Sequence, residues 1–79
     1  MKCKVLGIER VNYTKKDGKL VNGASVYIGE ERKNDPNVRG MVTYSLWISL
    51  QENQEVSTGI VVGEHVDVQY NRWGRMEIM

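Results

Sequence analysis

Only two side chains in the chain, Cys3 and His65, belong to the types that bind soft metals or form nucleophile–base pairs. A structural zinc site normally takes four Cys or His ligands, so these two residues are too few. A Cys–His nucleophile would also need both side chains side by side at an oxyanion hole, which no motif here indicates. The sequence contains no Gly-x-x-x-x-Gly-Lys phosphate loop and no paired carboxylates in an apolar segment. We therefore expect a protein that is not an enzyme and that holds no metal or cofactor.

Two aromatic side chains lie in the middle of segments that alternate between polar and apolar residues. Tyr27 follows Ser25, and Trp47 lies between Ser45 and Ser49. Side chains alternate between the faces of a strand, so even-numbered residues in the core would leave Tyr27 and Trp47 on the solvent side. Exposed rings on a sheet can stack on unpaired bases, at about 1–3 kcal/mol per base. The same rings could instead form a dimer interface, where aromatic residues are also enriched.

The elements that must position these rings are strands, because the dominant hydrophobic period of the chain is two. The Asp17-Gly18 pair is a strong hairpin signal, and a second tight turn is expected at 71–74. A bulge near Glu9–Arg10 would bring Val11 into the core, and the glycines are interpreted as turn and bulge residues. Segment 51–58 is expected to be a loop or a short helical turn. The strands are expected at 2–13, 20–31, 40–50, 65–70 and 75–79.

This layout is a three-strand meander, a connection and a terminal hairpin, within one domain that spans residues 1–79. It predicts an all-β fold, a five-stranded OB-fold-like small barrel whose helix between the third and fourth strands is reduced or absent. An SH3-like barrel is the structural alternative.

Charge is segregated along the chain although the formal net charge is only +1. Residues 1–39 carry nine Lys or Arg and five Asp or Glu, whereas residues 40–71 carry no Lys or Arg and four acids. Cations in turns can contact phosphates, and we expect them to surround the aromatic face as an electrostatic groove. Trp73, between two of these arginines, is either a third stacking platform or a cap on the core. The cations in the expected turns are Lys15, Lys16, Lys19, Arg32, Lys33, Arg39, Arg72 and Arg75.

Cysteine usage favours a reducing, cytoplasmic location, because a single cysteine cannot form an internal disulfide. Met1 is followed by Lys-Cys-Lys and an alternating segment, so we expect no signal peptide. No run approaches the roughly 20 apolar residues of a membrane span, and no membrane partner is expected.

Three segments together resemble the small OB-fold single-stranded-DNA-binding proteins of filamentous phages and related mobile elements. They are the Lys15–Lys19 turn after a long first strand, the strand that carries Tyr27, and the ending at 62–78. The resemblance covers most of the chain and is one of layout. It implies non-catalytic binding, usually by a dimer that coats single strands during DNA replication or transfer. It also implies a loop-borne aromatic residue and an extended basic hairpin, a role that would fall to Arg32, Lys33 and Arg39.

The leading hypothesis is therefore largely sequence-independent binding of single-stranded DNA, with RNA as an open alternative, by a homodimer. Bases would stack on Tyr27, Trp47 and Trp73, and the turn cations would contact phosphates. The second hypothesis is a small protein–protein interaction module that uses the same aromatic face. In that case the acidic segment 51–67 could meet basic partners.

Overall fold

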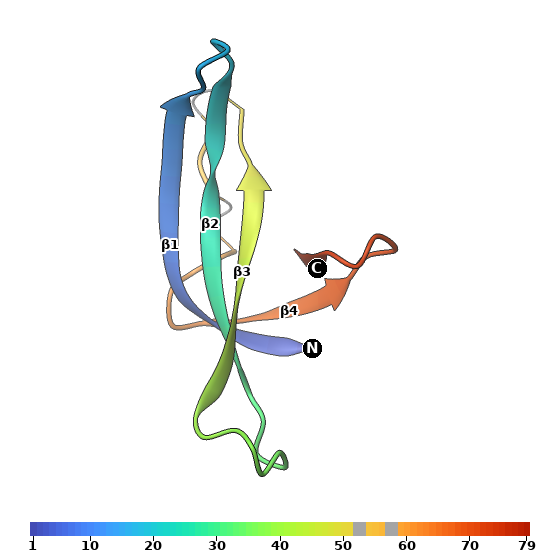
Figure 1. The fold of residues 1–79 in the computed structure, drawn as a ribbon. Coiled ribbons are helices and arrows are strands. Elements are labelled where there is room, and N and C mark those ends of the chain that lie inside the picture. Colours follow the sequence, from blue (N-terminus) through green and yellow to red (C-terminus); the bar gives the residue numbers. More distant parts are fainter. Residues whose placement is uncertain (52–53, 57–58) are drawn as a thin grey trace.

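The computed structural model describes residues 1–51, 54–56 and 59–79 and contains five antiparallel strands (Figure 1). No helix occurs among these residues, so the expectation of an all-β, five-stranded fold is confirmed. Four residues of the expected loop or helical turn at 51–58, namely 52–53 and 57–58, lie outside the described residues. The strands are β1 (Lys2–Thr14), β2 (Leu20–Glu31), β3 (Met41–Ser49), β4 (His65–Tyr70) and β5 (Met76–Ile78).

The strands form one sheet in the order β3-β2-β1-β4-β5. β1 pairs with β2 along most of its length, but only its first residues pair with β4, from Lys2 opposite Asp67 to Lys4 opposite His65. β4 then crosses the lower part of the three-strand sheet, and β5 pairs only with β4 (Figure 1). Among the described residues β3 and β5 are not paired with each other, so the sheet has two edges and is not closed.

β1 changes face at a bulge between Val5 and Gly7. Before the bulge Val5 points into the core, and after it Ile8 does so, opposite Val26. The bulge expected near Glu9–Arg10 is therefore misplaced. Val11 lies opposite Gly23 on the other face of the sheet and does not reach the core. The bulge occurs where β1 leaves β4 and continues with β2 alone, because the strand must coil there.

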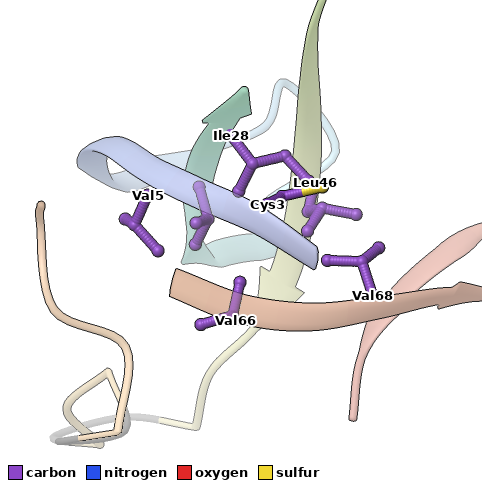
Figure 2. Packing of buried hydrophobic residues seen from close by; sticks show 7 residues of the cluster. Cys3, Val5, Ile28, Leu46, Val66 and Val68 are labelled. Carbon is purple, nitrogen blue, oxygen red and sulfur yellow. The ribbon is translucent and has the colours of Figure 1, made fainter. Parts of the chain in front are cut away.

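The hydrophobic core lies between the meander β1–β3 and strand β4. Cys3, Val5, Val26, Ile28 and Val68 are fully buried (Figure 2). Leu46 and Val66 complete this cluster, and side chains of β5 pack against it from the side. Burial of each such apolar side chain is worth about 1.5–3 kcal/mol. The buried residues of β2 and β3 apart from glycine, Ala24, Val26, Ile28 and Leu46, are even-numbered as the alternation predicts, whereas Leu20 at the start of β2 is 54% exposed.

A polar network fastens the segment after β3 to the inner side of the upper hairpin. The Arg10 guanidinium donates to the carbonyl oxygen of Gln54 at 2.9 Å and pairs with the Glu55 carboxylate at 3.3 Å. Asn22 donates to the carbonyl oxygen of Gln51 at 2.9 Å. Arg10 therefore takes the inward position beyond Ile8, where the core ends.

No helix in the described part of the chain is long and apolar enough to cross a membrane.

Candidate nucleic-acid interface

The two aromatic side chains predicted to face away from the core do so. Tyr27 is 40% exposed and Trp47 is 48% exposed, and they come from neighbouring strands. Tyr27 lies opposite Ser45, and Trp47 lies opposite Ser25. We call this side of β1–β3 the outer face. Around the two rings this face carries glycine or serine at Gly7, Gly23, Ser25, Ser45 and Ser49, and β1 adds Glu9 opposite Ser25 and Val11 opposite Gly23.

The Trp47 indole lies across the backbone of Gly23. An ideal Cβ placed on Gly23 would be 2.4 Å from Cζ2 of the indole and 2.5 Å from the carbonyl oxygen of Ile48. The indole N–H donates to Ser49 Oγ at 3.2 Å. Because Gly23 has no side chain, the ring lies against the sheet, and the hydrogen bond fixes its direction.

Tyr27 is held in a similar way but more loosely. An ideal Cβ on Gly7 would be 3.9 Å from Cδ2 of the Tyr27 ring, which is an ordinary contact distance. The phenol O–H donates to the Glu9 carboxylate at 3.3 Å. Tyr27 and Trp47 are diagonal neighbours on adjacent strands, a relationship that places residues about 7–8 Å apart, with their Cβ atoms somewhat closer.

Glycine on the outer face is a feature that the sequence interpretation missed. Gly23 and Gly29 were expected in turns or bulges, but both lie inside β2 and are buried beneath outer-face side chains. The Met41 sulfur and Leu6 Cδ1 would be 2.7 and 3.1 Å from a Cβ on Gly29. The signal was available, since both glycines are odd-numbered like Tyr27 and so share its face. The turn interpretation holds where φ is positive, as at Gly18 and Gly74.

The turn between β1 and β2 presents three lysines to solvent. Gly18 adopts a positive φ of 86°, and Asp17 Oδ1 accepts a hydrogen bond from the backbone N–H of Lys19 at 3.0 Å. The side chains of Lys15, Lys16 and Lys19 form no ion pair with any described residue. They are therefore available for phosphate contacts.

The loop between β2 and β3 offers less free positive charge than the sequence suggests. Arg32 pairs with Glu30 at 2.7 Å and also donates to the Tyr44 hydroxyl, while Lys33 pairs with Glu31 at 3.6 Å. The hydrogen bond with Glu30 raises the pKa of Arg32 above its ordinary value. Arg39 is exposed, and no described residue forms an ion pair with it.

The turn between β4 and β5 exposes an indole flanked by two arginines. Asn71 Oδ1 accepts hydrogen bonds from the backbone N–H groups of Trp73 at 2.9 Å and Arg75 at 3.0 Å. The Arg72 guanidinium carbon lies 4.4 Å from the centroid of the Trp73 ring. Trp73 is 70% exposed, so it does not cap the core.

The three cationic turns do not surround the outer face as one groove, and that expectation is wrong. Consecutive turns of an antiparallel meander must lie at opposite ends of the strand they share. The 15–19 turn is at the top of β2 and the 32–40 loop is at the bottom (Figure 1). The molecule measures 47 Å along its longest axis. The 71–75 turn projects to the side, beyond the bent part of β1 (Figure 1).

Cys3 and His65 do not form a catalytic pair. Their strands are neighbours, but Cys3 is paired with Val66 on the core side, whereas His65 is exposed opposite Lys4. Burial raises the pKa of the Cys3 thiol, which disfavours the reactive thiolate. The described residues contain no group of three or more His, Cys, Asp or Glu that could hold a metal ion.

Tyr27 and Trp47 are thus together on one surface, and the cations lie at its two ends and to one side. A scan against protein-family models, a search of curated proteins and a search of solved structures each found no match to this chain.

Proposed function

We propose that this protein binds single-stranded DNA, largely independently of sequence and without catalysis, by stacking bases on Tyr27 and Trp47. The observation that carries the proposal is the solvent exposure of both rings at the centre of one sheet face. Nothing bulky lies between them, because the residues paired with Trp47 and Tyr27 on β2 and β3 are Ser25 and Ser45, and Glu9 lies beside Tyr27 on β1. Stacking on such rings tolerates any base, since every base has a π face.

The position of the cations supports a path along the long axis of the molecule rather than a pocket. A strand that crosses Trp47 and Tyr27 would run between the 15–19 turn and the 32–40 loop (Figure 1). At the upper end Lys15, Lys16 and Lys19 would contact phosphates. At the lower end Arg39 would contribute most, because Arg32 and Lys33 already pair with carboxylates.

The 71–75 turn would supply a separate contact. Arg72 and Arg75 would bind phosphate, and Trp73 would offer the ring face that Arg72 does not cover. Because this turn projects away from the outer face, it would contact a different part of the same strand.

The fold and assembly expected from the sequence belong to the same proposal. The observed strand order would be that of an OB-fold-like, partly open barrel if the two edge strands β3 and β5 approached each other. We propose that a homodimer of such modules coats single strands during replication or transfer of a phage or mobile element. The resemblance in layout described above supports this assignment.

The proposal is tested with a short fluorescein-labelled oligo-dT and anisotropy titrations at several salt concentrations. We expect saturable binding at low salt, with an affinity that falls as salt rises because counterions are released from the strand. A duplex of the same length should compete poorly, and oligo-U measures the preference for DNA over RNA. Absence of binding at low salt would refute the proposal.

One observation favours a second candidate, a protein interface on the same face. Leu6 is 41% exposed and packs with Met41 over Gly29, which extends the aromatic surface with apolar side chains. An apolar interface would depend weakly on salt, so self-association that persists at high salt, without oligo-dT binding, would favour this candidate.

A further inference from the structure

A cleft of about 750 Å³ separates β3 from the β4–β5 hairpin. Its volume is within the roughly 300–1,000 Å³ range of protein ligand pockets. The lining is mixed, and it comes from β3, from the connection after β3 and from the β4–β5 hairpin. Its apolar residues are Leu46, Trp47, Ile48, Leu50, Ile60, Val66, Met76, Ile78 and Met79, and its polar residues are Gln54, Glu55, His65, Asp67 and Glu77.

Both strands that border this cleft have an unpaired edge. β3 pairs only with β2, and β5 pairs only with β4. Leu50 donates its backbone N–H to Asn22 at 3.0 Å, so even-numbered residues of β3 form the ladder with β2. By the alternation of antiparallel ladders, the backbone groups of Thr43, Ser45 and Trp47 then point outward. A row of unpaired N–H and C=O groups is a template for another strand.

The two edges determine the side-chain pattern of a strand that could lie between them. Inward side chains would meet Leu46 and Ile48 of β3 and Ile78 of β5, so apolar side chains fit there. Outward side chains would lie beside Ser45 and Trp47 of β3 on one side and Glu77 of β5 on the other.

Charge then selects among the possible outward side chains. Segment 40–71, which supplies β3 and β4, contains no lysine or arginine. Glu77 forms no ion pair with any described residue, and its carboxylate accepts a hydrogen bond from the Gln69 amide at 3.4 Å. A cation opposite Glu77 would be favoured, and a cation beside the exposed Trp47 ring could also form a cation–π contact.

We infer that this cleft is a docking site for an extended segment of a partner protein that alternates apolar with Lys or Arg residues. The segment adds to the edge of β3 by backbone hydrogen bonds, buries its apolar side chains against Leu46, Ile48 and Ile78, and places a cation near Glu77. The docked segment would share the edge of Trp47 with the proposed base-stacking surface, whereas its apolar side chains would lie on the core side of the sheet, away from that surface.

The test uses a blocked, fluorescein-labelled heptapeptide that alternates lysine with valine, titrated with the full chain. A control peptide has the same composition with the valines grouped together, which cannot present one apolar face. We expect saturable binding of the alternating peptide only. Ser45→Pro removes a backbone N–H that points away from β2, so the hydrogen bonds between β3 and β2 are kept. The affinity for the alternating peptide should fall about fivefold.

Glu77→Lys should weaken the affinity for the alternating peptide about two- to fivefold. Glu64→Lys is the matched control, because it makes the same charge change at an exposed residue outside the cleft, and it should leave that affinity unchanged. Circular dichroism and the oligo-dT titration show whether each variant keeps the fold and the outer face. Hydrogen exchange of the Thr43, Ser45 and Trp47 amides should be fast in the free protein and slow with peptide.

Three results would overturn the inference. The first is no saturation up to about 1 mM peptide. The second is equal weakening by Glu77→Lys and Glu64→Lys, which would indicate nonspecific attraction. The third is slow exchange of the outward β3 amides in the free protein, because β5 or a second copy of the chain would then already occupy the edge.

Discussion

The two tryptophans of this chain occupy opposite kinds of environment. Trp47 is 48% exposed, lies against the glycine backbone of a neighbouring strand, and donates its N–H to Ser49. Trp73 is 70% exposed, belongs to a turn, and is covered on one face by Arg72. A ring held by the sheet has little conformational freedom left to lose when a base stacks on it, whereas a ring on a turn loses more. The comparison assigns the larger share of stacking energy to Trp47.

The largest expected effect is that of Trp47→Ala on oligo-dT binding. Loss of one stacking platform should weaken affinity by about 1–3 kcal/mol, or roughly five- to 150-fold. The core cluster does not include Trp47, so the far-UV spectrum should stay native and the free energy of unfolding should change by about 1 kcal/mol or less. Anisotropy and urea titrations measure the two quantities. Unfolding of the variant would show that the indole is a core residue.

Gly23→Ala should disturb the same ring without removing it. The added Cβ would meet the indole at 2.4 Å and the Ile48 carbonyl at 2.5 Å, so we expect about 1–3 kcal/mol of destabilisation and a weaker affinity. Gly7→Ala is the matched control, because its Cβ would meet Tyr27 only at 3.9 Å. Urea denaturation and oligo-dT titration of both variants check this. Equal effects of the two substitutions would contradict the account of how Trp47 is held.

Removing the positive charges of the 15–19 turn should change how the affinity for oligo-dT depends on salt, and should have less effect on how the affinity depends on base sequence. Each phosphate contact on a single strand contributes about 0.7 to the slope of log K against log salt. The triple variant Lys15→Gln, Lys16→Gln and Lys19→Gln should therefore reduce the slope by up to about 2. The double variant Arg32→Gln and Lys33→Gln should reduce it less, because those cations already pair with Glu30 and Glu31. A larger change in the double variant would place the phosphate path elsewhere.

The smallest effect is expected for Trp73→Ala. Only one face of its ring is free, and the turn geometry is kept by Asn71 rather than by the indole. We expect a loss of affinity of no more than about 1 kcal/mol, measured by the same anisotropy titration. A loss of affinity as large as that of Trp47→Ala would contradict the conclusion that Trp47 contributes more stacking energy than Trp73.

Much of the fold could be predicted from the sequence, since β2 and β3 alternate without interruption. In such strands one buried residue determines the face of every other, so the outward positions of Tyr27 and Trp47 follow from Val26 and Leu46. β1 is different, because it contains a bulge between Val5 and Gly7 whose position depends on where β4 ends its pairing with β1. Local sequence does not contain that information, and Val11 was therefore assigned to the wrong face.

The arrangement of the candidate site was less predictable than its members. The sequence shows which turns carry cations. Neighbouring turns of a meander lie at opposite ends of the strand between them, so these cations are a full strand length apart and do not form one groove. Arg32 and Lys33 each pair with a glutamate two positions earlier in the chain, Glu30 and Glu31, so this neutralisation depends on local side-chain conformations at the end of β2 and not on strand register. The role of Gly23 became visible only with the Trp47 ring in place.

The most direct test of base stacking on the outer face is the intrinsic fluorescence of a Trp73→Phe variant, in which Trp47 is the only indole. We expect a short oligo-dT at low salt to quench its emission in a saturable way and added salt to restore it. Binding of labelled oligo-dT that leaves Trp47 emission unchanged would contradict stacking on this face, and no binding at all would remove the nucleic-acid proposal.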